Sequence, residues 1–488
     1  MSTVPDIRIE TCNNAPVNGD GEFVLYWMIA NRRLRWNFSL QRAVQWARQL
    51  NKPLVILEAL RVDYPWASDR LHRFVMDGMA EKARQLDGAG VLYYPYIEPA
   101  RGAGRGLLEA LAARASVVVT DDFPCFFLPR MVAAAAKKIP IRLEKVDSNG
   151  LLPLRAAQQA YPTAFAFRRF LQRNLHPHVH IPPQATPLAE APLPPARQLP
   201  DQILRRWPRA EPALLDGDET ALTTLPINHR VKATAIRGGE QAARATLRRF
   251  LDERLAQYGR LRNEPEQEMT SGLSPYLHFG FISVHEVLDE LMRREHQSVD
   301  HLPLGGNGER YGWWPVSEPA QAFLDELITW RELGYNMCGQ RDDYDRYESL
   351  PAWAQATLAA HAQDRRPYLY TLEELEAGRT HDPLWNAAQM QLVREGRIHN
   401  YLRMLWGKKI LQWSPTPQEA LAVMIELNNK YALDGRDPNS YSGIFWCLGR
   451  YDRPWGPERP IFGTVRYMSS ENTARKVSVK RYIQTYAP

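Results

Sequence analysis

The sequence has few cysteines and no pattern that would pair them. There are four in 488 residues, with no C-x-x-C pair and no close histidines at the spacing of a metal site. Disulfide scaffolds and zinc modules depend on such spacing. We therefore expect reduced thiols and no metal site; the four residues are Cys12, Cys125, Cys338 and Cys447.

Long apolar runs are also missing. The run FVLYWMIA at 23–30 is much shorter than the about 20 residues that a membrane-spanning helix needs. The N-terminus has no basic segment followed by an apolar one, so no secretory signal or targeting extension is expected. These absences favour a protein of a prokaryotic cytoplasm without membrane contact.

No extreme of charge stands out. The net charge is +6 and the pI about 9.0, which mildly favours a polyanionic partner such as nucleic acid. The apolar share of 44% and charged share of 24% are ordinary for a globular protein. A chain of 488 residues is too long for one core, which predicts two or three domains.

The first third alternates short β-rich runs with helix-like runs, which predicts a parallel sheet covered by helices. GAGRG at 102–106 is a weak match to a dinucleotide loop, because it does not follow the first strand, and is read as a turn into a helix. The expected strands are 23–29, 53–60, 91–97, 116–120 and 141–146, with helices at 38–50 and 67–86.

The remaining chain changes character twice. Residues 177–200 are too rich in proline for a helix or central strand and indicate an extended connector. From about Gly239 the pattern is almost wholly helical, with helices expected at 239–258, 320–338, 383–397, 398–413 and 417–431. The predicted domains are therefore an α/β domain at 1–175, a connector at 176–238 and an all-helical domain at 239–488.

Several local patterns could bind a ligand, although each also has an ordinary structural interpretation. In TSGLSPYLHFG (270–280), Ser274 before Pro275 is a good helix cap, and hydroxyls beside free N–H groups bind phosphate. Four residues separate Glu326 from Trp330, which places a carboxyl beside an indole on one helix face. An arginine among apolar neighbours, Arg403, needs a carboxylate, and Asp434 in the turn DGRDPN is a candidate.

Three tryptophans lie in one basic, helix-favouring stretch, LWNAAQMQLVREGRIHNYLRMLWGKKILQW (384–413). On one straight helix Trp385 and Trp406 would be far apart, but a break near Gly396 allows two helices to fold back. Trp406 and Trp413 share a helix face. Without further information these residues would be packing anchors.

Taken together and in this order, the motifs resemble a known family. TSGLSPYLHFGFIS (270–283), ELITWREL (326–333) and IHNYLRM (398–404) followed by DGRDP (434–438) resemble the flavin-binding helical domain of the photolyase/cryptochrome family. The resemblance covers nearly the whole chain. Further motifs resemble the class II cyclobutane pyrimidine dimer photolyases specifically: WNAAQ (385–389), RMLWGKKILQW (403–413), NNKYALDGRDPNSYSG (428–443) and FGTVRYM (462–468).

The resemblance implies a FAD site in the helical domain. Arg403 and Asp434 would form an ion pair against the isoalloxazine ring, beside Gly435, and Asn428 would face the flavin N5. In other classes the N5-facing Asn lies just after the turn, where this chain has Pro438 and Asn439. The residues that would hold the FAD phosphates are Tyr258, Thr270, Ser271, Gly272, Leu273 and Ser274.

The implied reaction is light-driven repair of pyrimidine dimers in DNA by electron transfer from excited FADH⁻. Glu326 would hydrogen-bond the thymine carbonyl and, with Asn428, would be catalytic. The dimer must be flipped out of the duplex, and Trp446 and Arg466 would fill the space it leaves. The other residues lining the dimer cavity would be Trp330, Asn400 and Met404.

The resemblance also gives the tryptophans an electron-transfer role: Trp406 nearest FAD, Trp385 in the middle and Trp413 at the surface. The resemblance also implies a place for an antenna such as a deazaflavin or a folate in the α/β domain, and no motif decides which, if any, is bound. We expect a monomer that binds ultraviolet-damaged DNA.

Two other functions fit parts of the sequence. A cryptochrome-like blue-light receptor shares the FAD pocket but often has an extended tail, whereas this chain ends at Pro488, soon after FGTVRYM. A basic helical nucleic-acid-binding protein without cofactor would need neither Asn428 nor Arg403. Flavin absorbance and light-dependent repair would separate the three.

Overall fold

The chain folds into two compact units, each built from segments that are discontinuous in sequence. The structure is a computed structural model that describes residues 3–189 and 192–488. The first unit contains residues up to Ala157, together with 174–248 and 273–300, and the second contains 158–173, 249–272 and 301–488. Glu190 and Ala191, in the predicted connector, lie outside the described residues.

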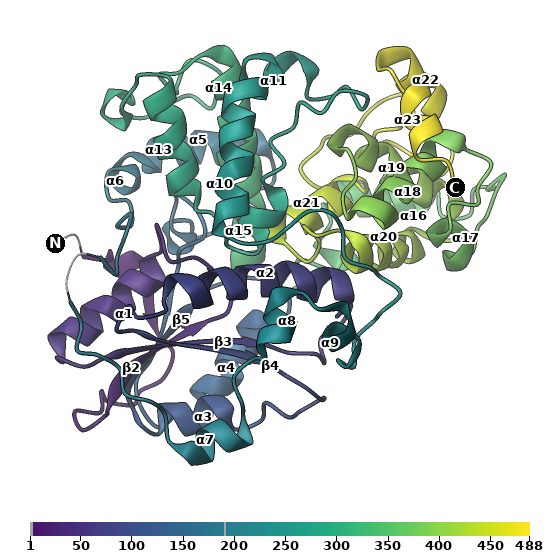
Figure 1. The fold of residues 1–488 in the computed structure, drawn as a ribbon. Helices are drawn as coiled ribbons and strands as arrows, with labels where there is room; N and C mark the ends of the chain where they lie inside the picture. The colour runs from purple at the N-terminus through teal and green to yellow at the C-terminus, as the bar shows by residue number, and fades with distance from the viewer. Residues whose placement is uncertain (1–2, 190–191) are drawn as a thin grey trace. The chain divides into compact units, whose positions relative to one another are not determined.

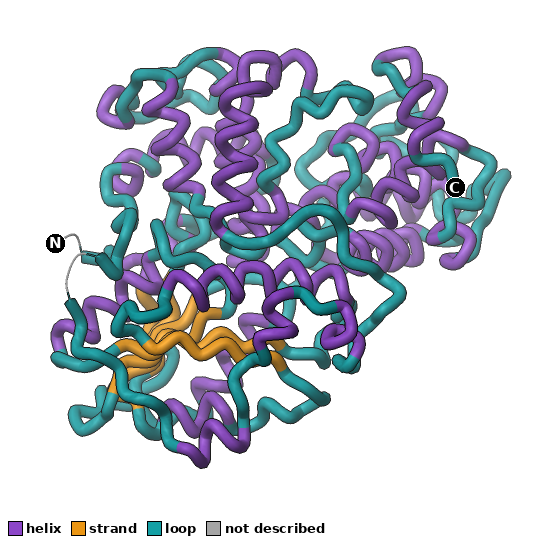
Figure 2. Tube along the Cα trace, in the orientation of Figure 1, coloured by secondary structure: helices purple, strands orange, loops and turns teal. Residues whose placement is uncertain are grey.

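The first unit contains a six-stranded sheet in the order β1-β6-β5-β2-β3-β4 (Figures 1 and 2). All neighbouring strands are parallel except β1, which pairs antiparallel with β6. Figure 1 shows α1 and α2 along one face of the sheet, with α3 and α4 on the other. The strands are β1 (Ile9–Thr11), β2 (Phe23–Met28), β3 (Leu54–Leu60), β4 (Leu92–Ile97), β5 (Ala115–Asp121) and β6 (Leu143–Val146).

The helices of the first unit connect these strands and extend beyond them. Because both faces are covered, the central strands are buried along their length, which explains their nearly continuous apolar sequences. The helices are α1 (Phe38–Gln49), α2 (Asp69–Gln85), α3 (Leu107–Ala112), α4 (Leu128–Ala136), α6 (His176–Val179), α7 (Asp201–Arg206), α8 (Pro212–Asp216), α9 (Glu219–Thr223), α10 (Glu240–Arg249), α12 (Ser274–His278) and α13 (Val284–Arg294), with short 3₁₀ turns η1 (Asp6–Arg8), η2 (Leu154–Ala156) and η4 (Val299–His301).

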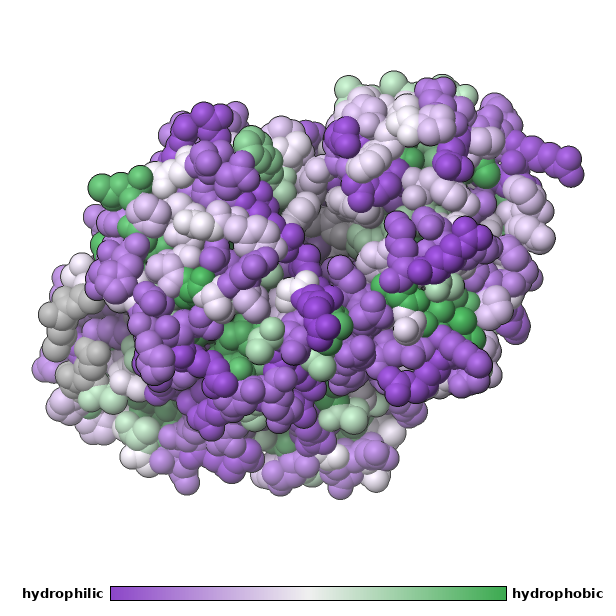
Figure 3. Space-filling model, turned by 90° about the horizontal axis from the view of Figure 1, so that it is seen from above, coloured by the Kyte–Doolittle hydropathy of each residue, from purple (hydrophilic) through white to green (hydrophobic). Residues whose placement is uncertain are grey.

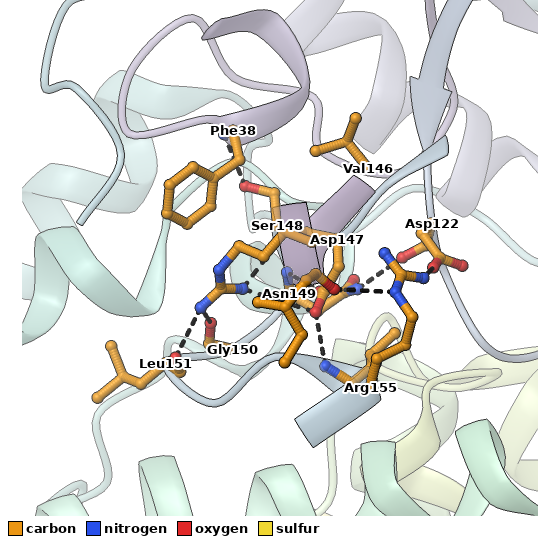
Figure 4. Close-up of polar contacts among 12 residues, drawn as sticks. Phe38, Asp122, Val146, Asp147, Ser148, Asn149, Gly150, Leu151 and Arg155 are labelled. Carbon is orange, nitrogen blue, oxygen red and sulfur yellow. Dashed lines mark hydrogen bonds and ion pairs between the residues drawn. The ribbon is translucent and has the colours of Figure 1, made fainter. Parts of the chain in front are cut away.

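A polar network joins the segments that follow β5 and β6 (Figure 4). Ser148 Oγ accepts from the N–H of Phe38 at 3.0 Å, and Asn149 Nδ2 donates to the carbonyl of Asp122 at 2.6 Å. Arg155 Nη1 lies 2.8 Å from Asp122 Oδ2. The residues of this network bond to one another and to the backbone, which explains how the ends of these strands are held.

The second unit is entirely helical apart from its loops, with α18 and α19 packed together. Two of its helical runs contain π-helical stretches, η3 and η5, of a kind often found at functional sites. Its elements are α5 (Ala164–Asn174), η3 (Phe250–Arg254), α11 (Leu255–Leu261), α14 (Glu318–Leu324), η5 (Asp325–Trp330), α15 (Arg331–Gln340), η6 (Tyr347–Ser349), α16 (Ala352–Ala360), α17 (Leu372–Glu376), α18 (Pro383–Glu395), α19 (Asn400–Trp413), α20 (Pro417–Tyr431), α21 (Pro438–Trp446), α22 (Ser470–Lys476) and α23 (Lys480–Thr485).

The predicted fold class, a parallel α/β sheet followed by a helical part, is confirmed. All five expected strands are present, but the short edge strand β1 was missed. The helices expected at 239–258 and 320–338 are each interrupted by a π-helical stretch, which α-helical periodicity does not reveal. GAGRG is a turn into α3, with Gly106 in the left-handed region at φ 87°.

The rest of the molecule shows three further features. Among the described residues no helix is both long and apolar enough to cross a bilayer. All four cysteines are free thiols, three of them buried and Cys12 half-buried. The face seen in Figure 3 is largely hydrophilic, with small apolar areas scattered over it.

Candidate cofactor and nucleic-acid site

The tryptophan-rich stretch forms two helices that fold back on each other. Helix α18 ends at Glu395 and is capped by Gly396, whose φ of 70° is left-handed and favours glycine, and α19 begins at Asn400. The break predicted near Gly396 is therefore present. All three tryptophans are among the largest fully buried side chains of the protein: Trp385, Trp406 and Trp413.

These tryptophans are connected by short contacts. Trp385 Nε1 donates to the backbone carbonyl of Trp406 at 3.0 Å, and the rings of Trp385 and Trp413 lie 5.4 Å apart in an edge arrangement. The order Trp406, Trp385, Trp413 is thus spatially continuous. Trp406 Nε1 donates to Oε1 of the buried Gln389 at 2.9 Å.

The expected surface position of Trp413 is wrong, because only 1% of this residue is exposed. Tyr370 and His381 cover it, each with its ring centre 5.3 Å from that of Trp413. The covering residues come from a loop and from the segment before α18, so helix periodicity within α19 did not reveal them. The exposed Tyr368 stacks on His381 at 3.8 Å.

Arg403 and Asp434 form the expected ion pair. Arg403 Nη2, on α19, lies 3.2 and 3.3 Å from the two carboxylate oxygens of Asp434, in the turn after α20. The two side chains keep 14% and 13% of their surface exposed. Arg403 Nε is buried without a hydrogen-bond partner among the described residues. An unpaired buried donor next to a partly accessible ion pair suits a polar ligand.

Asn428 lies on α20, and two hydrogen bonds from its amide nitrogen fix its side chain. Its Nδ2 donates to Ser440 Oγ at 2.7 Å and to Asn429 Oδ1 at 3.2 Å. Asn429 Oδ1 in turn accepts from the backbone N–H of Arg436 at 2.9 Å. The Oδ1 of Asn428 has no partner among the described residues, so one amide acceptor stays available for a ligand.

Gly435 is required by the close packing of this turn. A Cβ at Gly435 would lie 2.9 Å from the carbonyl oxygen of Asn428 and 3.1 Å from that of Ala432. Any larger residue would push the turn away from the end of α20. Gly435 therefore supports the placement of Asp434 and Asn428.

Glu326 and Trp330 both lie in the π-helical stretch η5. Glu326 forms an ion pair with Arg262, the residue that caps the end of α11, and about a quarter of the Glu326 side chain is exposed. The guanidinium of Arg262 also lies over the ring of Tyr258, 5.7 Å from its centre. Burial, and then the charge of Glu326, raise the pKa of Tyr258, so this phenol stays protonated.

Of the segment expected to bind phosphate, residues 270–274, only the last residue lies in a helix. Helix α12 begins at Ser274 itself and spans five residues, and its cap residue Leu273 makes no side-chain cap hydrogen bond. Ser274 is therefore not the N-cap, because Leu273 adopts helical angles one residue earlier. Thr270 and Ser271 are half-buried in the second unit, whereas Leu273 and Ser274 belong to the first.

One arginine contacts Thr270 in the second unit. Arg254 Nη1 donates to the carbonyl of Thr270 at 3.2 Å, and Glu268 pairs with both Arg254 and Arg397.

Burial and the neighbouring Arg397 lower the pKa of His399 to about 4, so His399 is neutral near pH 7.

The residues expected to meet DNA are the more accessible ones. Asn400, the first residue of α19, is exposed, and Met404 is half-buried one turn further. Trp446 is half-buried at the end of α21, and the guanidinium of Arg466 lies 5.3 Å from the centre of its ring. The two residues expected to enter the DNA duplex, Trp446 and Arg466, therefore lie in contact with each other.

Sequence reasoning missed the residues that hold the site together. Ser440 and Asn429 position Asn428, Arg262 pairs with Glu326, and Arg254 approaches Thr270. The two asparagines at 428–429, just before a turn, could be seen in the sequence. Their order did not show that the side chain of Asn429 accepts a hydrogen bond from that of Asn428. Lys408, fully buried on α19, gave no sequence signal beyond its apolar neighbours.

The chain is similar over nearly its whole length to several curated proteins. A protein named deoxyribodipyrimidine photo-lyase from Methanothermobacter thermautotrophicus is 34% identical over 98% of this chain and 97% of its own length. Proteins of the same name from Potorous tridactylus and Arabidopsis thaliana are each 32% identical, over 95% and 94% of this chain and 81% and 88% of their own lengths. No family model matches the chain.

The fold has a counterpart among solved structures. A bacterial class III photolyase from Agrobacterium tumefaciens superimposes with a TM-score of 0.66 over 96% of this chain and 86% of its own. At 18% sequence identity this likeness concerns the fold alone.

Proposed function

The chain belongs to the photolyase/cryptochrome family, and on that basis we propose that it repairs cyclobutane pyrimidine dimers in DNA by light-driven electron transfer, as a class II photolyase. The observation that carries the proposal is the ion pair of Arg403 with Asp434, in which the buried Nε of Arg403 has no hydrogen-bond partner among the described residues. On α20, the amide nitrogen of Asn428 is held by Ser440, which leaves the amide oxygen for a ligand. Full-length relatives named deoxyribodipyrimidine photo-lyase support the reaction.

These residues fit the isoalloxazine ring of FAD. Arg403 would offer a charged donor, Asp434 would keep that guanidinium in place, and Asn428 Oδ1 would accept a hydrogen bond from the flavin N5–H. An amide suits this position because it adds no negative charge beside a reduced flavin. Bound as FADH⁻, this cofactor would supply the photoexcited electron for ring opening.

The FAD phosphates would lie near Tyr258 and the half-buried hydroxyls of Thr270 and Ser271. The approach of Arg254 to Thr270 supports this placement, because a cation and hydroxyls together favour an anion. Gly272, Leu273 and Ser274 are proposed to continue the phosphate contact on the strength of the motif.

Glu326 would hold the lesion. Its pairing with Arg262 orients the carboxyl group and leaves about a quarter of the side chain accessible to the lesion. As a carboxylate Glu326 would accept from a thymine N–H, and it would donate to a thymine carbonyl only in its protonated form. Trp330, Met404 and Asn400 would pack around the dimer. Stacking on an indole suits a flipped pyrimidine pair of any sequence context.

Trp446 and Arg466 would enter the space that the flipped dimer leaves in the duplex. Their cation–π contact presents a flat aromatic surface with a positive charge beside it, which suits unpaired bases and nearby phosphates. The net charge of +6 adds a general attraction to DNA. The protein would act as a monomer on damaged DNA. Any antenna chromophore would bind in the α/β part.

The buried tryptophans would carry electrons to the flavin during photoreduction. The proposed order is Trp406, Trp385 and Trp413, with aromatic neighbours of Trp413 continuing toward the exposed Tyr368.

One experiment tests the proposal. Purified protein should show flavin absorbance and, with reductant and blue light, should restore thymines in a dimer-containing oligonucleotide. A protein that binds FAD and leaves dimers intact under these conditions would instead be a cryptochrome-like receptor. A protein that binds DNA without any flavin spectrum would be a cofactor-free nucleic-acid-binding protein.

A further inference from the structure

Helix α19 contains two adjacent lysines that are both buried: Lys408 at 0% and Lys409 at 6% exposure. A buried ammonium normally requires a carboxylate partner. Lys409 has one, because its Nζ lies 3.4 Å from Asp382 Oδ2. Among the described residues no carboxylate lies within ion-pair distance of Lys408.

Lys408 instead binds the end of α21. Its Nζ donates to the backbone carbonyl of Cys447 at 2.7 Å, and Cys447 is the residue that caps α21. The last carbonyls of a helix lack partners within the helix and carry its partial negative charge, so an ammonium there satisfies both needs. Burial lowers the pKa of Lys408 to about 8, with Arg466 adding to the effect, so near pH 7 the charge is retained.

The two helices approach closely at this point. A Cβ at Gly407 would lie 2.5 Å from Cys447 Sγ and 3.0 Å from Met424 Sδ, so the residue before Lys408 admits no side chain. This contact places Lys408 where it reaches the end of α21. The attachment is therefore short and has little room to shift.

Trp446, the last residue of α21, lies next to this hydrogen bond between Lys408 and Cys447. The Nζ of Lys408 lies 5.0 Å from the centre of the Trp446 ring, and the guanidinium of Arg466 lies 5.3 Å from the same centre. Arg466 is itself tied to Asp452 at 3.2 Å and lies over the ring of Trp455. One buried cation and one accessible cation thus contact the same indole.

We propose that Lys408 is a positioning residue for DNA opening: by binding the Cys447 carbonyl and the Trp446 ring, it holds this indole in the orientation that enters the duplex. The inference rests on the proposed function, in which Trp446 fills the space left by the flipped dimer. In this proposal Lys408 acts through Cys447 and Trp446 and not directly on the flavin or the lesion. Its influence should be restricted to substrates that must be opened.

The test compares duplex with single-stranded DNA carrying one thymine dimer, using protein whose flavin is chemically reduced. Lys408→Met keeps the length of the side chain and removes the charge and donor. We expect about a tenfold fall in duplex affinity, the equivalent of one lost hydrogen bond to a charged group. Repair of the single strand should be unchanged. A 2-aminopurine opposite the dimer should show a weaker fluorescence rise in the duplex.

A double-mutant cycle shows whether Lys408 acts through the tryptophan. Trp446→Ala should reduce duplex binding, and adding Lys408→Met should reduce it no further. Lys409→Met is the matched control, because it removes a buried ammonium one residue away on the same helix. It should leave the ratio of duplex to single-strand repair at the wild-type value.

Several results would overturn the inference: equal losses on single and double strands, additive losses in the cycle, or unchanged duplex affinity. Lys408→Gln keeps a donor and replaces Lys408→Met if that variant does not fold. If neither folds, Lys408 is a structural residue and the inference is wrong. Failure of wild-type protein to repair either substrate would refute the proposed function instead.

Discussion

Replacing Trp406 by phenylalanine should separate photoreduction of the flavin from repair of the dimer. The change removes an indole whose N–H donates to Gln389 and leaves a benzene ring, which gives up an electron much less readily. Photoreduction of the oxidised flavin by light and external reductant should therefore fall sharply. Repair should persist once the flavin has been reduced chemically, because that step uses the flavin electron directly.

The stability cost of Trp406→Phe can be worked out from the same contacts. Trp406 Nε1 donates to Gln389 Oε1 at 2.9 Å in a site without solvent, so the variant leaves that oxygen unsatisfied, at about 1–3 kcal/mol. The smaller ring adds about 1–2 kcal/mol for lost packing. The sum is below the roughly 5–15 kcal/mol that stabilises a typical domain, so the variant should fold with a lowered melting temperature.

Trp46→Phe is the matched control. Trp46 is a buried tryptophan of the first unit whose indole donates to Glu144 at 2.8 Å, so its replacement carries a similar stability cost. Photoreduction is followed as the decay of oxidised-flavin absorbance under blue light. Unchanged decay in Trp406→Phe, or an equal slowing in Trp46→Phe, would refute the electron-transfer assignment.

Three further changes test other parts of the molecule. Asp434→Asn leaves the guanidinium of Arg403 without its counter-charge. The variant should bind flavin more weakly, by about 1–3 kcal/mol because the ion pair is partly exposed. Flavin should therefore be lost on gel filtration, as measured by absorbance, and full retention of flavin would contradict this. Glu326→Gln should reduce dimer repair per absorbed photon while photoreduction continues, and equal repair yields would remove Glu326 from the reaction. Burial raises the pKa of Glu240, which accepts from the N–H of Leu34, from 4.5 to about 7. Its stabilising contribution should be complete below pH 4.5 and decline by about 3 kcal/mol as the pH rises through 7, so Glu240→Gln should flatten the pH dependence of the melting temperature between pH 5 and 8.

Local patterns determined much of this protein. The alternation of apolar strands with amphipathic helices predicted the parallel sheet, because strands buried on both faces must be apolar throughout. A glycine between two helix-forming runs predicted the fold-back at Gly396, since that residue accepts a left-handed φ. The motif order also identified the candidate residues Arg403, Asp434 and Asn428, which lie within one region of the second unit.

Only the tertiary structure decided how these residues meet. The pairing of Arg403 with Asp434 spans 31 positions, and that of Arg262 with Glu326 spans 64. Periodicity reports which face of a helix is buried but not what covers it. For that reason Trp413 was expected at the surface, and the attachment of Lys408 to the end of α21 was not foreseen. Contacts between distant segments depend on how the elements pack, which no local spacing specifies.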